Sequence, residues 1–144
     1  GEQIQRGYTW LAGAGLITDH VMGGSAGRWC GKLIDADHGR GLNRFEDAEG
    51  TVTRSLPFAV SVGHKSDIDG STTTTLLNYA NTTSQVFQMM RDEIRCLNDR
   101  VCLGIGGFTS MGGPANGSPF MLHREALTAT ERGTNRGGTK HILW

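Results

Sequence analysis

The chain has 144 residues, with 14 basic and 14 acidic side chains and therefore no formal net charge. This length is enough for one domain with a single hydrophobic core. Without net charge there is no long-range field to attract a nucleic acid or an anionic membrane. The longest uncharged apolar run, residues 11–17, is far shorter than the ~20 residues that cross a bilayer. We therefore expect no nucleic-acid partner and no transmembrane segment, in a protein that is soluble or peripheral to a membrane complex.

The first part of the chain, residues 1–27, is expected to form a short helix followed by a glycine-rich loop. Ile4, Tyr8 and Leu11 have the spacing of one face of a helix, and three glycines within residues 18–27 predict the loop. The first residue is Gly rather than Met, which indicates a processed precursor, a truncated chain or an incompletely observed end. A removed targeting segment would suit a chloroplast or mitochondrial protein.

The body of the fold, residues 28–125, is expected to consist mainly of antiparallel strands. Side chains alternate along residues 28–36 and 58–63 in the manner of half-buried strands. A polar turn at 65–70 leads into the threonine-rich segment 71–79, which predicts a hairpin with the strand before it. Further strands are expected at residues 42–45, 51–54, 101–108 and 119–124.

One segment of this body has helical spacing instead. Phe87, Met90, Ile94 and Leu97 are separated by three, four and three residues, which predicts a helix of about three turns with Ser84 as its N-cap. We expect the charged residues of this segment to form a solvated face with salt bridges. In the alternative, its carboxylates point inward and serve as acid and base for a small substrate. These charged residues are Arg91, Asp92, Glu93 and Arg95.

A C-terminal tail, residues 126–144, completes the chain. Residues 128–140 have no apolar side chain except Ala129, and the tail closes with the apolar residues Ile142, Leu143 and Trp144. Such a tail is expected to fray. If it is ordered, its backbone is held either by its own barrel or by a neighbouring protein.

The first and last predicted strands carry a short family pattern. Gly27-Arg28-Trp29 opens the first of them and Arg124 ends the last, which resembles the Gly-x-Trp signature of lipocalins and fatty-acid-binding-like proteins and the Arg that those families place across from the Trp. The resemblance implies a calycin-type barrel whose closed end is plugged by Trp29 and covered by the guanidinium of Arg124.

A longer resemblance runs from Phe58 to Leu122. Over this segment the chain is similar to uncharacterised lipocalin-like proteins of bacteria and algae, and the runs that carry the similarity are Ser66-Asp67-Ile68-Asp69-Gly70, Leu77-Asn78-Tyr79, Arg91-Asp92-Glu93-Ile94-Arg95 and Leu103-Gly104-Ile105-Gly106. Gly27 to Lys32 also fits the G-x-W-x-G pattern of a family of unknown function. The resemblance implies an α+β, mainly β fold: a small antiparallel lipocalin-like barrel with one short packed helix, and no catalytic residue.

A different resemblance lies in the glycine-rich loop. Asp19-His20-Val21-Met22-Gly23-Gly24 looks like the opening of the complex I intermediate-associated protein 30 family, a β-sandwich of assembly factors. This would imply a sandwich in place of the barrel.

The three cysteines, Cys30, Cys96 and Cys102, include no C-x-x-C pair of the kind that holds zinc. Cys96 and Cys102 flank an Asn-Asp turn and could form a disulfide if that turn folds back. Buried free thiols are the expected state.

No metal site is expected. His64 and His123 lie on predicted strands and could meet across the sheet, but the pattern supplies no third ligand. Asp35-Ala36-Asp37-His38 could chelate a metal ion. However, Asp is common in glycine-rich turns because its side chain forms hydrogen bonds with the nearby backbone. Asp67-Ile68-Asp69-Gly70 has only part of a calcium loop and is interpreted as a turn.

Three functions fit these patterns. The favoured one is a non-enzymatic accessory or structural subunit of a larger complex, in contact with other protein subunits. An organellar complex, photosynthetic or respiratory, would suit the resemblance. The residues expected to bind such a partner are Met22, Gly23, Gly24, Ile142, Leu143 and Trp144.

The second function is that of a carrier of a small hydrophobic molecule such as a lipid or pigment, without any other cofactor. Its expected ligand-binding residues are Trp29, Phe58, Val60, Tyr79, Leu103, Phe120 and Arg124. The third is an enzyme for an apolar small molecule that uses Tyr79, Asp92 or His64.

Overall fold

The structure is a computed structural model that describes residues 27–124 and 142–143. In this part of the chain the regular elements are almost all strands. They are β1 (Arg28–Asp35), β2 (Arg40–Glu46), β3 (Val52–His64), β4 (Thr74–Asn78), β5 (Met90–Cys96), β6 (Val101–Phe108), β7 (Ser118–His123) and β8 (Ile142–Leu143). Three short 3-10 helices lie between them: η2 (Phe87–Met89), η3 (Thr109–Met111) and η4 (Gly113–Asn116).

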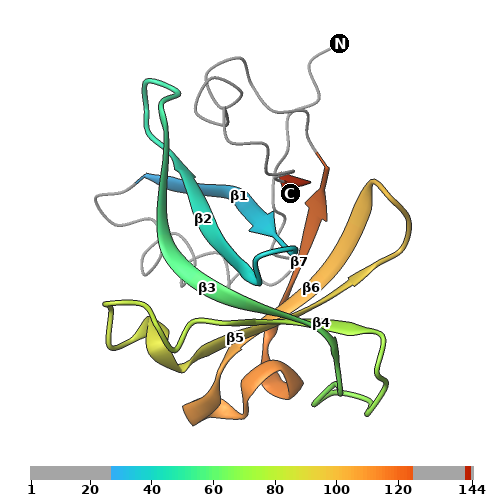
Figure 1. Cartoon of the computed structure of the whole chain (residues 1–144). Helices are drawn as coiled ribbons and strands as arrows, with labels where there is room; N and C mark the ends of the chain where they lie inside the picture. Colours follow the sequence, from blue (N-terminus) through green and yellow to red (C-terminus); the bar gives the residue numbers. More distant parts are fainter. Residues whose placement is uncertain (1–26, 125–141, 144) are drawn as a thin grey trace.

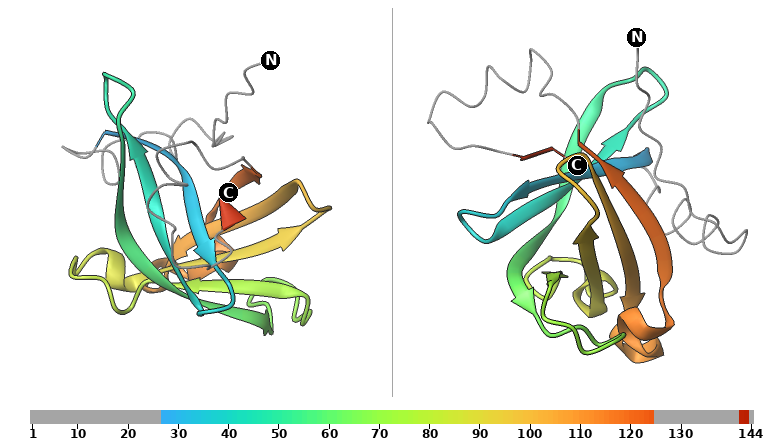
Figure 2. Two further views of the ribbon diagram at one scale, coloured as in Figure 1. Left: turned by 45° about the horizontal axis from the view of Figure 1, so that its top comes forward. Right: turned by 90° about the vertical axis from the view of Figure 1, so that its right-hand side faces the viewer.

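The strands form one antiparallel sheet in the order β7-β6-β5-β4-β3-β2-β1-β8. From β1 to β7, each strand pairs with the next one along the chain, so the sheet is an up-and-down meander. Figures 1 and 2 show the sheet curling until its two ends approach each other, as a nearly closed barrel. The prediction of a mainly β, antiparallel barrel is therefore confirmed.

Side chains connect β1 and β7, the two strands that meet where the barrel closes. The ring of Trp29 on β1 meets the ring of Phe120 on β7 edge to face, with 5.9 Å between the centroids. The Phe120 ring in turn lies directly over Gly104 of β6, where a Cβ atom would collide with it. An aromatic contact thus joins the first strand of the meander to the last.

The predicted helix over residues 84–97 is wrong. Only the 3-10 turn η2 forms there, and β5 begins directly after it. Met90, Asp92 and Ile94 alternate as strand residues with 6%, 2% and 4% of their surface exposed. The apolar spacing looked helical because the inward position between Met90 and Ile94 holds a carboxylate instead of an apolar side chain. The solvated charged face predicted for this segment is also wrong, because Asp92 and Glu93 are both buried.

Other predicted elements are found. The hairpin between residues 58–63 and 71–79 is confirmed as the β3–β4 pair, which runs from Ala59 opposite Asn78 to His64 opposite Thr74. In the tail, Ile142 and Leu143 pair with Ile34 and Leu33 of β1, so that β8 is held by the barrel itself. The predicted helix over residues 2–12, the glycine-rich loop and the rest of the tail lie outside the described residues.

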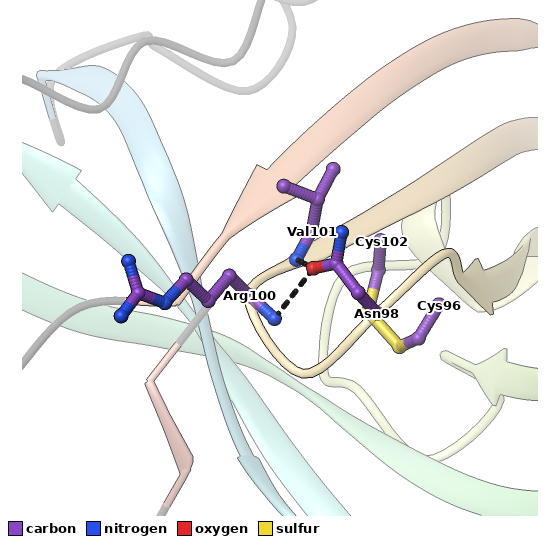
Figure 3. Close-up of a disulfide and its surroundings, with 5 residues drawn as sticks. All are labelled: Cys96, Asn98, Arg100, Val101 and Cys102. Carbon is purple, nitrogen blue, oxygen red and sulfur yellow. Dashed lines mark hydrogen bonds between the residues drawn. A yellow bond between two sulfur atoms is a disulfide. The ribbon is translucent and has the colours of Figure 1, made fainter.

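Cys96 and Cys102 form a disulfide across the tip of the β5–β6 hairpin. Figure 3 shows the turn that allows it: Oδ1 of Asn98 accepts hydrogen bonds from the backbone N–H groups of Arg100 (2.8 Å) and Val101 (2.9 Å). The expectation of free thiols at these two positions is therefore wrong.

Candidate functional site

A lysine lies inside the barrel. Lys32 on β1 is 2% exposed, and its ammonium group has three N–H donors. These have three acceptors within reach: Oδ1 of Asn43 at 2.9 Å, the hydroxyl of Tyr79 at 2.5 Å and Oδ2 of Asp92 at 2.8 Å. We call Lys32, Asn43, Tyr79 and Asp92 the Lys32 cluster.

The partners of Lys32 also bond to one another. The Tyr79 hydroxyl donates to Oδ2 of Asp92 at 2.9 Å and accepts from Nδ2 of Asn43 at 3.2 Å. Oδ1 of Asn43 accepts a second hydrogen bond from the indole N–H of Trp29 at 3.0 Å, and its Nδ2 also donates to the carbonyl of Leu56 at 3.1 Å. All hydrogen-bond donor and acceptor positions of the Asn43 amide and the Tyr79 hydroxyl are thus occupied. This is the condition under which a buried polar network is stable.

The backbone is shaped to hold this cluster. Asn43 faces Lys32 directly in the β1–β2 register, and the β2–β3 ladder is irregular between Leu42 and Asn43. Leu56, whose carbonyl accepts from Asn43, has a φ of 51°, in the left-handed region that a leucine rarely adopts. Backbone strain of this kind persists only where the surroundings enforce it, and it gathers at functional sites.

Aromatic rings surround the ammonium group. The Nζ atom of Lys32 lies 5.2–5.5 Å from the ring centroids of Phe58, Tyr79, Phe120 and Trp29, within the range of a cation–π interaction. A glycine makes room on the carboxylate side, because a Cβ atom at Gly106 would lie 2.6 Å from Oδ1 of Asp92. The cluster therefore combines a buried ion pair with an aromatic shell.

Burial changes the proton affinities of two members. Removal from water lowers the pKa of Lys32, and the adjacent Asp92 carboxylate offsets part of this effect by favouring the ammonium form. The pKa of Tyr79 is raised well above its usual value, first by burial and then by the charge of Asp92. Tyr79 is accordingly a neutral phenol at physiological pH and donates a hydrogen bond to the Asp92 carboxylate.

The structure gathers five of the residues predicted to bind a ligand. Tyr79 and Phe58 belong to the buried core, and Trp29, Val60 and Phe120 are half-buried against it. Leu103 does not join them, because its side chain is 47% exposed. Arg124 is exposed as well, and its backbone N–H donates to the carbonyl of Arg100.

The ammonium of Lys32 lies over the Trp29 ring, 5.5 Å from its centroid, at the ring that the resemblance pairs with the guanidinium of Arg124. Lys32 and Asn43 were not singled out from the sequence. A signal for Lys32 was present, because it shares a strand face with Cys30 and the buried Ile34. No comparable signal marked Asn43.

The two other predicted turns serve local structure. Asp35 accepts from the backbone N–H of His38 at 3.2 Å and lies 2.9 Å from its ring nitrogen, so that this carboxylate caps the turn. The segment 67–70 is a turn as expected, with the hydroxyl of Ser66 accepting from the backbone N–H of Ile68 at 3.0 Å. His64 lies near Asp67 and Glu93, and His123 is not part of that group.

Comparisons of the chain with protein-family models, with curated proteins and with solved structures find no match. Within residues 27–124 and 142–143, no helix is long and apolar enough to cross a membrane.

Proposed function

We propose that the protein is a non-enzymatic accessory subunit that acts through its surface in a larger assembly. The Lys32 cluster carries this proposal, because its members are only 0–2% exposed and bond to one another. A catalytic lysine, tyrosine or aspartate has to reach a substrate atom. The cluster members reach each other instead, which supports a role in holding the barrel rigid.

A surface feature supports a protein partner. Val86, Met89 and Met111 have exposed fractions of 51%, 42% and 65%. They belong to one end of the barrel, since Met89 precedes Met90 and Met111 closely follows Phe108, and Met90 and Phe108 are paired across β5 and β6. We call these three residues the methionine patch. Flexible, polarisable methionine side chains adapt well to a partner's surface.

The resemblance described above supports two further parts of the same proposal. The Gly27-x-Trp29-x-Gly31 pattern supports membership of the lipocalin-like barrels. The similarity to algal proteins supports a setting in an organellar complex, photosynthetic or respiratory.

A carrier of a small hydrophobic molecule is the second candidate, and one observation favours it. The rings of Trp29 and Phe120 are only half-buried where β1 and β7 approach each other, so a flat apolar molecule could rest on them. The space behind these rings is taken up by Lys32 and Tyr79. A ligand at this place would therefore be small and peripheral.

Native mass spectrometry on protein taken from its source, repeated after denaturation, separates the two candidates. The subunit proposal predicts a native mass that includes another protein and no small molecule. An excess of a few hundred daltons that organic solvent extracts would instead establish the carrier and overturn the subunit proposal.

Surface variants then test the location of the contact. Met89→Gln combined with Met111→Gln is expected to remove the partner mass while the melting temperature stays unchanged. Leu97→Gln is the matched control, because Leu97 is 65% exposed and lies beside the disulfide, at the opposite end of β5. If the control and the patch variant lose the partner equally, or neither loses it, the methionine patch is not the contact.

A further inference from the structure

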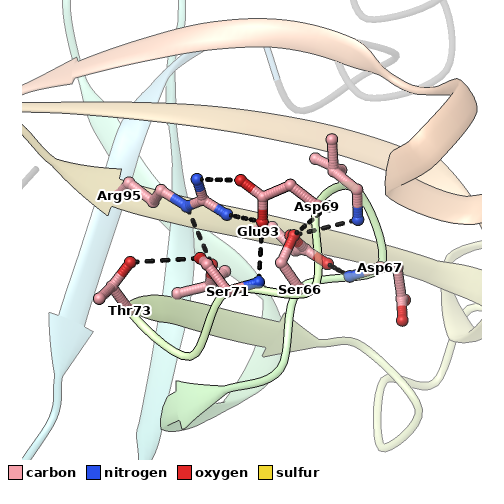
Figure 4. Close-up of polar contacts among 9 residues, drawn as sticks. Ser66, Asp67, Asp69, Ser71, Thr73, Glu93 and Arg95 are labelled. Carbon is pink, nitrogen blue, oxygen red and sulfur yellow. Dashed lines mark hydrogen bonds and ion pairs between the residues drawn. The ribbon is translucent and has the colours of Figure 1, made fainter.

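The loop between β3 and β4 folds over the outer face of the sheet. Asp92 points into the barrel, so its neighbour Glu93 points outward, yet Glu93 is only 4% exposed. Figure 4 shows what covers it: the Ser66 hydroxyl donates to Oε2 of Glu93 at 2.6 Å, and the backbone N–H of Asp67 donates to Oε1 at 2.7 Å. Arg95 binds both carboxylate oxygens of Asp69 at 2.6 Å and fastens the far side of the loop.

Three side chains of metal-ligating type converge at the start of this loop. One ring nitrogen of His64 and one carboxylate oxygen each from Asp67 and Glu93 all lie within 4.8 Å of one another. They come from the end of β3, from the turn and from β5. The turn therefore brings His64 and Asp67, three residues apart, close to Glu93, which is distant from them in the sequence.

A second observation points to a ligand at this place. Nε2 of His64 is buried and has no hydrogen-bond partner within the described part of the chain. A buried polar atom without a partner is costly, and native structures rarely keep one without a reason. A metal ion bound through Nε2 would remove this cost.

The donor set selects the class of metal. One imidazole nitrogen and two carboxylate oxygens suit Zn²⁺ or a similar first-row ion, whereas Mg²⁺ and Ca²⁺ prefer oxygen ligands alone. Glu93 is already oriented by the Ser66 hydroxyl and the Asp67 backbone N–H, and each of its oxygens retains a lone pair for a metal. Outer hydrogen bonds of this kind commonly fix a carboxylate ligand.

The geometry requires only a small closing movement. Ligands at about 2.0–2.1 Å from a tetrahedral ion lie about 3.3 Å from each other, so the three groups have to approach by no more than about 1.5 Å. The exposed Asp67 side chain, which lies on a turn, has the freedom to make this movement. The two carboxylates would also offset the charge of a divalent cation.

We propose that His64, Asp67 and Glu93 bind a Zn²⁺ ion on the outer face of the barrel, with water as its fourth ligand. The ion ties the β3–β4 loop to β5. This site is separate from the Lys32 cluster and does not depend on the proposed function. It also replaces the sequence-based expectation of no metal site, in which a third ligand for His64 was missing.

The experiment titrates Zn²⁺ into the chelator-treated full chain by calorimetry and follows the melting temperature in parallel. Asp67→Asn is the main variant, because its side chain is exposed and the backbone N–H that holds Glu93 remains. We expect Asp67→Asn and His64→Gln each to weaken one Zn²⁺ site by more than about tenfold and to reduce the rise in melting temperature. Mg²⁺ at the same concentration is expected to have no effect.

His123→Gln is the matched control, since His123 also lies on a strand but outside the group. It is expected to bind Zn²⁺ as the wild type does, and the comparison accounts for His20 and His141, which are outside the described residues. The proposal is overturned if the wild type binds no Zn²⁺ at millimolar concentration. It is equally overturned if Asp67→Asn binds as tightly as the wild type, or if His123→Gln loses the same site.

Discussion

Asp92 and Glu93 are consecutive residues of β5 that are buried on opposite faces of the sheet, with exposed fractions of 2% and 4%. Inside, Asp92 pairs with Lys32 at 2.8 Å; outside, Glu93 accepts from Ser66 at 2.6 Å. A shift of β5 by one residue would exchange the two faces and leave both carboxylates without their partners. This pair of residues therefore fixes the register of β5 from both sides.

The inner ion pair leads to the first prediction. Lys32→Met is expected to lower the free energy of unfolding by about 3–5 kcal/mol, because Asp92 would remain as a buried charge without a counter-ion. The double variant Lys32→Met with Asp92→Asn removes both charges and is expected to cost clearly less than the sum of the single variants. Urea unfolding measures the free energy of unfolding of the two single variants and of the double variant.

Arg28→Met serves as the control for this cycle. Its partner in the exposed ion pair is Glu46, at 3.1 Å, and exposed pairs contribute at most about 1 kcal/mol. If Lys32→Met costs no more than Arg28→Met, the Lys32 cluster is not the stabilising network described above.

Tyr79 leads to a prediction for alkaline pH. Its pKa is raised in the folded protein, so the phenol stays neutral there while an unfolded chain ionises near pH 10. The stability it contributes is complete below pH ~10 and is lost as pH rises towards the folded pKa, by up to about 1.4 kcal/mol per pH unit. Tyr79→Phe removes this contribution to the pH dependence.

Tyrosinate absorbance provides the measurement, because the chain has only two tyrosines. The signal of Tyr79, taken as the difference between the wild type and Tyr79→Phe, is expected to appear only when circular dichroism reports unfolding. A difference signal that titrates near pH 10 in the folded protein would show that Tyr79 is accessible to water.

The contact of Phe120 with Gly104 leads to a steric prediction. A Cβ atom at Gly104 would collide with the Phe120 ring, so Gly104→Ala is expected to destabilise the barrel by about 1–3 kcal/mol. Phe120→Leu in the same chain frees the space and is expected to restore part of the loss. Thermal unfolding of both single variants and the double variant tests this, and simple additivity would argue against the collision.

The disulfide leads to the last prediction. Cys96 and Cys102 are six residues apart, and cross-linking so short a loop contributes about 2 kcal/mol through the unfolded chain. A reducing agent is therefore expected to lower the melting temperature of the wild type. The double variant Cys96→Ala with Cys102→Ala is the control and should melt at the same temperature with or without the reductant.

Much of the fold could be predicted from local patterns. The β3–β4 hairpin followed from alternation along residues 58–63 and from the polar turn at 65–70, because both signals are contained in neighbouring residues. The helix predicted over residues 84–97 was wrong because the decisive contact is not local. The partner that makes Asp92 an inward residue is Lys32, on a strand far away in the sequence, and local periodicity carries no information about it.

The residues of the two sites likewise divide into those that local sequence patterns predict and those that depend on distant contacts. Trp29, Phe58 and Phe120 were expected to lie together, since large aromatic side chains in alternating strands gather in a core. Asn43 and the contact of Ser66 with Glu93 could not be foreseen. They depend on the β1–β2 register and on a loop that folds across β4, neither of which a residue type indicates.

The short strand β8 has a consequence for association between molecules. Ile142 and Leu143 pair through the backbone with Ile34 and Leu33 along one edge of β1. An unpaired strand edge is a template to which another chain can add a strand. Removal of residues 142–143 would uncover this edge and favour edge-to-edge polymers of the barrel. The backbone pairing of β8 thus protects this edge of β1 from pairing with a strand of another molecule.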